Sequence, residues 1–202
     1  MDNTELQRQV RRLAAESEIR QTIYRYCRGI DRRDWKLMES AFHPDATDNH
    51  GVYSGTATGF IESTKPRHNF ITMSMHNITN IMIEFKSDRE ALAESYCIGV
   101  HRYSAEGSAA LGAIVGDAPG LQGKGVELTM WVRYLDIMTR RDGAWRIAER
   151  QVIWEGMRSA AVDASAPPLD SKWVLACRDS SDPVFARGRE LGLPSAAGSS
   201  PA

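Results

Sequence analysis

An aspartate at the end of a predicted helix is the first side chain that could do chemistry. Apolar residues recur at helical spacing from Ile19 to Ile30, and Asp31 follows them directly. The free carbonyls at a helix C-terminus repel a carboxylate, so Asp31 is poorly placed there unless a cationic group pairs with it. A carboxylate paired with an imidazole can orient it for acid–base catalysis. The alternative is that Asp31 only ends the helix and is solvated.

Two polar aromatic residues end a predicted strand whose inward face is otherwise small. In ALAESYCIGVHRY, one face carries Ser95, Cys97, Gly99, His101 and Tyr103. Small side chains on an inward face leave room for something other than side chains. We therefore expect this strand to line a pocket, with His101 and Tyr103 either acting on a ligand or only lining the space.

One arginine is predicted on the inner face of a sheet. Arg150 shares a strand face with Ala148, Val152 and Trp154. An arginine among apolar side chains is costly unless it meets an anion, which is either a substrate group or a protein carboxylate such as Asp31 or Glu127. The remaining interpretation is an arginine on the wet face of an antiparallel sheet.

The elements that position these residues change from helical to strand periodicity along the chain. Helices are expected over about 4 to 30 and 34 to 42, and strands over 74 to 85, 91 to 103, 126 to 139 and 144 to 154. Helices followed by long antiparallel strands predict an α+β fold, with the helices packed on one face of a bent sheet around a pocket.

Composition divides the chain into a domain and an appendage. Residues 1–158 are expected to form the domain, and residues 159–202 a C-terminal extension with a disordered, low-complexity end. The glycine- and alanine-rich stretch 105 to 125 is expected to be a loop. It is either a lid over a site or a disordered connection.

Charge and cysteine content exclude several classes of function. The net charge is −1 without a Lys/Arg block, so neither nucleic acid nor an anionic membrane is expected as a partner. No apolar run is long enough for a membrane span, and the N-terminus lacks a signal-peptide core. The three cysteines suit a reducing cytoplasm.

The histidines give no sign of a metal site. All five are dispersed and poorly partnered by cysteine, so no metal site is expected. His43, His50 and His68 fall in predicted loops or helix ends and are expected to be solvated.

Four stretches together resemble the SnoaL-like branch of the NTF2-like superfamily: GIDRRDW, AFHPDA, MHNITNIMIEF and RRDGAWRIAER. They cover roughly residues 10 to 155 in the order and spacing of that branch. The resemblance implies a cone of helices on a strongly bent sheet. Within the branch, the chain is similar to the scytalone dehydratase, bile acid 7α-dehydratase and hexachlorocyclohexane dehydrochlorinase families, which eliminate water or HCl without a cofactor.

The same resemblance assigns site residues. It implies that Asp31 and His76 form an Asp–His pair deep in the cone, with Tyr26 before the aspartate, Arg150 on the last strand and His101 as a second histidine. The dehydrochlorinases have a lysine where this chain has Tyr26. An oxygen leaving group is therefore favoured over a halide.

Those residues suit an elimination reaction. His76 would be the base and Asp31 its orienting partner. Tyr26 would hydrogen-bond to a carbonyl or leaving hydroxyl, and Arg150 would stabilise developing negative charge. Each residue also has a purely structural interpretation. Aromatic side chains around the cone suggest an apolar aromatic or polycyclic substrate, with contacts from His101, Tyr103, Tyr53, Trp131 and Trp154.

The leading hypothesis is a cofactor-independent lyase that removes water from a hydroxylated, largely apolar small molecule. C–C cleavage with loss of formaldehyde and double-bond isomerisation use the same groups. A non-catalytic subunit of the kind found in ring-hydroxylating dioxygenases, and a simple ligand-binding module, are the alternatives from other classes. An open sheet has a face and edges to cover, so a homo-oligomer is expected, either a trimer or a dimer.

Overall fold

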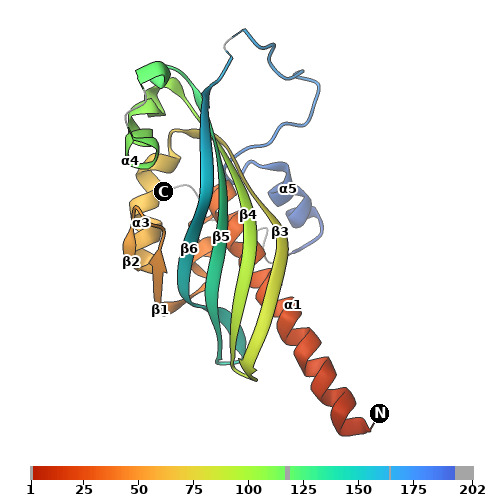
Figure 1. Cartoon of the computed structure of the whole chain (residues 1–202). Helices are drawn as coiled ribbons and strands as arrows, with labels where there is room; N and C mark the ends of the chain where they lie inside the picture. Colours follow the sequence, from red (N-terminus) through yellow and green to blue (C-terminus); the bar gives the residue numbers. More distant parts are fainter. Residues whose placement is uncertain (1, 117–118, 164, 194–202) are drawn as a thin grey trace.

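Six strands form one curled sheet in the order β2-β1-β6-β5-β4-β3, and the long helix α1 crosses behind it (Figure 1). The computed structural model describes residues 2–116, 119–163 and 165–193. All neighbouring strands are antiparallel except β1 and β6. The predicted α+β fold, with helices packed on a bent sheet, is confirmed.

The helices and strands have the following bounds. The α-helices are α1 Asn3–Arg32, α2 Trp35–Glu39, α3 Ala57–His68, α4 Gly112–Val115 and α5 Pro183–Glu190. The strands are β1 Phe42–Asn49, β2 Ser54–Thr56, β3 Ile71–Ser87, β4 Glu90–Tyr103, β5 Val126–Arg141 and β6 Ala144–Ala161. Two short 3₁₀ helices, η1 Ala105–Leu111 and η2 Pro119–Leu121, flank α4.

Helix α1 is one continuous helix whose first half projects beyond the sheet (Figure 1). Asp2 caps it, because its carboxylate accepts a hydrogen bond from the Glu5 N–H at 2.7 Å. The second half carries the predicted apolar stripe, and Ile19, Ile23 and Tyr26 are fully buried. This packing fixes the last turn of α1, and with it Asp31, against the sheet.

Helix α2 crosses the end of α1 so closely that the contact requires a glycine. A Cβ atom on Gly29 would lie 2.5 Å from the backbone nitrogen of Met38. Asp34 begins α2 by accepting a hydrogen bond from the Leu37 N–H at 3.1 Å. The chain therefore turns sharply after Asp31 and leads into β1.

A bulge in β3 changes which side chains face the helices. Strict alternation would put Met82 on the same face as His76, but the register with β4 shifts between Ile78 and Ile81. Met82 is consequently 62% exposed, and Ile83 is buried instead. The bulge lets β3 present His76 at one end and apolar core residues at the other.

Strand β4 has the predicted small inward face. Ser95, Cys97, Gly99 and His101 are buried, and the residues that alternate with them face outward. The stretch after β4 is folded where the structure describes it: η1, α4 and η2 follow in turn, and Leu111 is buried in the core.

The chain after β6 returns to α1. It arcs away from the sheet and comes back as α5, which packs beside α1 (Figure 1). The Arg28 guanidinium lies 5.4 Å from the Phe185 ring centroid, and Arg32 pairs with Asp182 at 3.0 Å. Residues 194–202, part of the end for which disorder was expected, lie outside the described residues. In the described residues, no helix is both long and apolar enough to span a membrane.

Candidate active site

Asp31 and His76 form a largely buried carboxylate–imidazole pair. Asp31 Oδ1 lies 2.7 Å from His76 Nδ1, and Oδ2 accepts the His76 backbone N–H at 2.9 Å. Ser74 also donates its hydroxyl to Asp31 Oδ1 at 2.6 Å. Burial alone would raise the pKa of Asp31, but His76 and these hydrogen bonds hold it well below its usual value. Because an ionised carboxylate only accepts, His76 Nδ1 carries a proton, and in the neutral form of the ring Nε2 is the proton acceptor.

His76 faces an internal cavity between α1, α3 and the sheet. The cavity has a volume of about 50 Å³ and is open to solvent. The walls are mostly apolar or aromatic, and they are formed by Tyr26, Ile30, His50, Val52, Phe60, Arg67, His76, Cys97, Gly99, His101, Ile114, Met130, Val132, Tyr134, Val152 and Trp154. Such a narrow, largely apolar space suits a small ring-shaped ligand.

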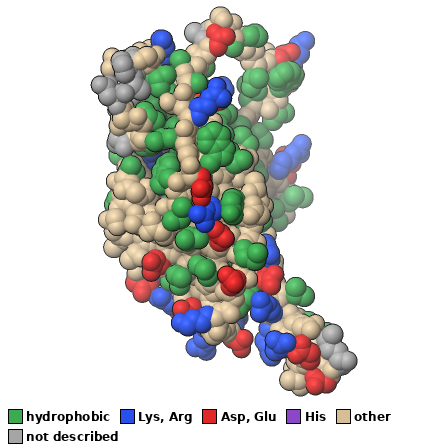
Figure 2. Space-filling view, in the orientation of Figure 1, with side chains coloured by type: hydrophobic (Ala, Val, Ile, Leu, Met, Phe, Trp, Pro, Cys, Tyr) green, Lys and Arg blue, Asp and Glu red, His purple; other side chains and the backbone are tan. Residues whose placement is uncertain are grey.

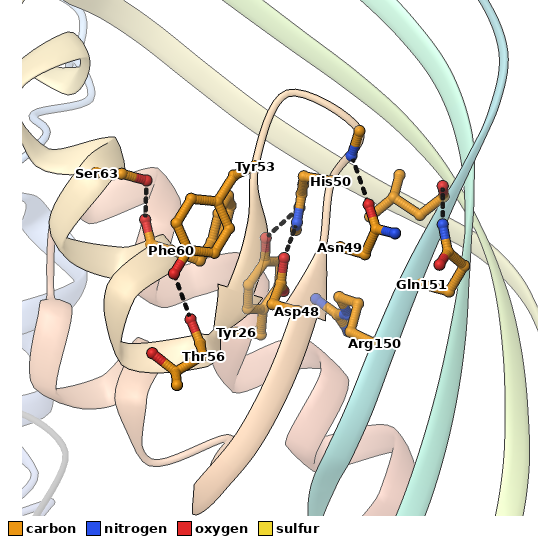
Figure 3. Close-up of polar contacts among 12 residues, drawn as sticks. Tyr26, Asp48, Asn49, His50, Tyr53, Thr56, Phe60, Ser63, Arg150 and Gln151 are labelled. Carbon is orange, nitrogen blue, oxygen red and sulfur yellow. Dashed lines mark hydrogen bonds and ion pairs between the residues drawn. The ribbon is translucent and has the colours of Figure 1, made fainter.

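A second carboxylate–imidazole pair faces the same cavity. His50 Nδ1 contacts Asp48 Oδ1, and its Nε2 lies 3.3 Å from the Tyr26 hydroxyl (Figure 3). Phe60 stacks on the His50 ring at 3.9 Å, and the Trp154 indole donates to the His50 carbonyl at 3.2 Å. The expectation that His50 is solvated is therefore wrong: it follows directly after β1, which carries it under α3.

The chemistry of this second pair follows from its burial. Burial lowers the pKa of His50, although Asp48 opposes the shift, so the ring is neutral near neutral pH. Burial raises the pKa of Tyr26, which keeps its hydroxyl protonated. Tyr26 thus donates to His50 Nε2, and His50 donates to Asp48. Sequence reasoning missed this pair, although an aspartate two residues before a histidine on one strand face was a visible signal.

His43 and His68 were also expected to be solvated, and both are buried. His43 Nε2 lies 3.0 Å from the Thr139 carbonyl, which suits a structural role. His68 closes α3, and its Nδ1 accepts a hydrogen bond from Arg178 at 2.9 Å. Neither residue lines the cavity.

Arg150 meets an anion inside the protein rather than in the cavity. Its guanidinium makes two 2.7 Å hydrogen bonds to the Asp136 carboxylate, and both side chains are fully buried. It also lies between the rings of Tyr26 and Tyr134, at 4.1 and 4.2 Å from their centroids. The predicted role in stabilising substrate charge is therefore corrected, as is the suggestion of Asp31 or Glu127 as its partner. Asp136 already neutralises this arginine.

The predicted substrate contacts divide into two groups. His101 and Trp154 line the cavity, and Tyr103 is buried with its ring 6.2 Å from that of His101. Tyr53 packs on Phe60 and uses its hydroxyl to contact the Thr56 carbonyl at 3.0 Å. Trp131 is 39% exposed on the outer face of β5, so its assignment is wrong. Strand alternation fixes that outcome, because Met130 and Val132 occupy the inward positions.

Two further arginines near the site were not predicted. Arg67, in the last turn of α3, is the one lysine or arginine among the described cavity-lining residues. Arg178, from the segment before α5, donates to the carbonyls of Ile30 and Asp31 at 3.1 and 3.0 Å. It also donates to the Ile71 carbonyl at 2.6 Å. In the described part of the chain, no three His, Cys, Asp or Glu side chains gather as a metal ion would require.

Comparison with known proteins now identifies the family. The sequence model of the SnoaL-like domain matches residues 11–151. The chain belongs to the SnoaL-like family, within the NTF2-like fold. No curated protein sequence matches the chain significantly.

Several solved structures share this fold. A scytalone dehydratase-like protein from Novosphingobium aromaticivorans is 19% identical, with a TM-score of 0.60 over 81% of this chain and 99% of the other. The dehydrochlorinase LinA is 16% identical, with a TM-score of 0.63 over 79% and 99%. A type 3 hexachlorocyclohexane dehydrochlorinase from Novosphingobium barchaimii is 17% identical, with a TM-score of 0.61 over 79% of this chain and 99% of the other. At these identities the similarity demonstrates the fold.

Proposed function

We propose that this SnoaL-like protein is a lyase that removes water from a small, hydroxylated, largely apolar aromatic compound without a cofactor. The observation that carries the proposal is the Asp31–His76 pair, which leaves His76 Nε2 as a proton acceptor in a largely apolar cavity. The dehydratase and dehydrochlorinase names of the structural neighbours support an elimination. The bond broken and the substrate class are our inference.

In the proposed reaction, His76 Nε2 takes a proton from a carbon of the substrate. The electron pair of that C–H bond forms a C=C bond, and the C–O bond to the neighbouring carbon breaks. The leaving hydroxide receives a proton from the Tyr26 hydroxyl, so that substrate becomes alkene plus water, and the proton held by His76 then restores Tyr26. Asp31 stabilises the imidazolium that forms and keeps the ring in the reactive tautomer.

Tyr26 and the Asp48–His50 pair supply a second proton-carrying group. The Tyr26 ring lies 6.3 Å from that of His76, and its hydroxyl is held by His50. Tyr26 can therefore give its hydroxyl proton to the leaving oxygen, and the proton that His76 took from carbon restores it once the alkene has formed.

The experiment is a turnover screen with hydroxylated aromatic compounds in the presence of a chelator, followed by mass spectrometry. Wild type, His76→Ala and the control His43→Ala are compared, because His43 is a buried histidine outside the cavity. We expect wild type and His43→Ala to yield products lighter by one water. His76→Ala should be slower by about 10²–10⁴-fold.

Other products would change the conclusion. Loss of the mass of formaldehyde would move the assignment to C–C cleavage, and an unchanged mass with a moved double bond would indicate an isomerase. Binding by wild type without turnover would overturn the lyase proposal in favour of a binding module or a non-catalytic subunit.

A further inference from the structure

One end of the cavity gathers polar groups for which the mechanism above has no use. They are Arg67 from the last turn of α3, and His101 and Tyr103 from the end of β4, here called the Arg67 corner. Arg67 and His101 both line the cavity, and the rings of His101 and Tyr103 are 6.2 Å apart. The corner adjoins the proposed base, because the His101 ring is 5.3 Å from that of His76.

The polar atoms of the Arg67 corner are buried and poorly satisfied. His101 is 3% exposed, and neither ring nitrogen has a hydrogen-bond partner among the described residues. The Tyr103 hydroxyl is buried as well and has no hydrogen-bond partner of regular geometry among the described residues, although Arg67 and Arg178 oppose the rise of its pKa that burial causes. A buried polar group left unpaired costs about 1–3 kcal/mol, so a native protein seldom keeps two together without a use.

In the part of the chain that the structure describes, Arg67 also lacks a carboxylate partner. The buried carboxylates near the cavity are paired with His76, His50 and Arg150. Within the described residues, none of them forms an ion pair with Arg67. The positive charge of Arg67 acts on its neighbour in the corner, because it is one of the causes that lower the pKa of His101. Burial is the larger cause of that shift, and it leaves His101 neutral with one N–H to donate.

The three side chains make one kind of binding site. A guanidinium presents a planar fork of N–H donors that matches a carboxylate, and a neutral imidazole and a protonated phenol each add a donor. The single positive charge of Arg67 balances the charge of one bound carboxylate. The apolar walls on the other sides of the cavity suit the remainder of an aromatic acid.

We propose that the Arg67 corner binds a carboxylate of the substrate, so that the substrate is a small aromatic carboxylic acid. This inference rests on the proposed lyase function only for its effect on catalysis, because a carboxylate bound at the Arg67 corner would hold the reacting carbon near His76. Its binding site, however, is defined by Arg67, His101 and Tyr103 alone.

The test is calorimetric binding of a matched pair of ligands, phenylacetate and phenylacetamide, to the full chain. The two ligands share size and ring and differ in charge. The variants are Arg67→Met and the control Lys65→Met, which removes a cation from the same helix at a side chain that is 37% exposed and paired with Glu62. We expect wild type and Lys65→Met to prefer the acid by about tenfold or more, and Arg67→Met to lose this preference while its affinity for the amide stays unchanged.

Several results would overturn the proposal. They are equal affinity of wild type for acid and amide, a preference for the acid that survives Arg67→Met, and no measurable binding of either ligand. The comparison of acid with amide on wild type needs no variant, so a misfolded Arg67→Met protein would not leave the question open. Arg67→Lys should recover part of the preference, because it restores charge without the fork.

The two proposals can fail separately. Binding of the acid is measured without turnover, so a preference for phenylacetate would stand even if His76→Ala showed that the protein is not a lyase. As an independent readout, nuclear magnetic resonance should show that the pKa of His101 rises when phenylacetate binds and stays constant with phenylacetamide. An unchanged pKa of His101 with the acid would place the carboxylate elsewhere.

Discussion

At the scale of single residues, the Asp31 carboxylate is stabilised in its charged form although it is largely buried. Its two oxygens accept from Ser74, the His76 ring and the His76 backbone. Its pKa is therefore lower in the folded than in the unfolded chain, where the usual value is 3.8. Stability from this group is present above that value and is lost as the pH falls below it toward the folded pKa.

This gives a prediction for acid unfolding. The free energy of unfolding of wild type, measured with urea, should fall between about pH 4 and pH 2 more steeply than that of Asp31→Asn. Asp88→Asn is the control, because Asp88 is exposed in the turn between β3 and β4. Parallel pH profiles for Asp31→Asn and wild type would show that Asp31 is not stabilised as a carboxylate.

The buried Arg150–Asp136 pair gives a second prediction at this scale. Arg150→Met should destabilise the fold by about 3–5 kcal/mol, because it leaves the Asp136 carboxylate buried and unpaired. The double variant Arg150→Met with Asp136→Leu should recover much of that loss. Urea unfolding of the four proteins of the cycle measures both effects. A double variant as unstable as Arg150→Met would mean that shape rather than charge is at stake.

Sequence reasoning succeeded for residues whose neighbours along the chain set their place. Asp31 ends a strongly periodic helix, and the family resemblance placed His76 opposite it, where the structure has it. The prediction that His50 is solvated was wrong, because this residue at the end of a short strand is buried by α3, which comes later in the chain. Arg67 was not predicted as a site residue for a similar reason, since nothing in its local sequence pattern shows that the last turn of α3 faces a cavity.

At the scale of elements, Arg178 fixes the segment before α5 to the ends of α1 and α3. Its guanidinium donates to four backbone carbonyls and to the His68 ring, and the carbonyl of Asp31 itself is among them. Free carbonyls at a helix C-terminus favour a cation, so Arg178 answers the groups that make this position unfavourable for Asp31. Arg178 is thus a positioning residue for the pair.

Arg178→Met should therefore destabilise the protein by at least about 1.5–3 kcal/mol, the value of a hydrogen bond to a charged group. It should also slow turnover more than the loss of folded protein explains. The control is Arg187→Met in α5, whose side chain is 79% exposed. If the folded fraction of Arg178→Met turned over at the wild-type rate, the contact would be structural only.

The helices and strands themselves were largely predictable from the sequence, but the irregularities and close contacts that fit them together were not. The long strands and the apolar stripe of α1 follow from periodicity, and both are where the pattern put them. The bulge at Ile78–Ile81 and the close contact between Gly29 and Met38 depend on the partner element, which a local pattern does not contain.

At the scale of the whole molecule, the outer face of the sheet is unusually apolar. Figure 2 shows hydrophobic side chains spread over this face around a small group of acidic and basic ones. The exposed apolar residues of β3, β4 and β5 are Met75, Met82, Leu92, Tyr96 and Trp131. Because α1 and α3 cover only the other face, we propose that a second copy of the chain covers this one.

The measurement is molar mass by light scattering. Wild type should elute as a dimer or trimer, and Trp131→Glu should shift toward the 22.5 kDa monomer. Lys86→Glu, which changes an exposed charge at the end of β3, should leave the mass unchanged. A monomeric wild type would contradict the proposal.

The contact between Arg178 and the Asp31 carbonyl has a consequence for how the protein is made. The two residues are 147 positions apart, so at the usual speed of translation Asp31 is synthesised roughly 7–30 s before Arg178. A growing chain can fold α1 and the sheet well before the arginine that braces Asp31 exists. The Asp–His pair is therefore expected to gain its final rigidity among the last events of biosynthesis, when the segment before α5 reaches the folded domain.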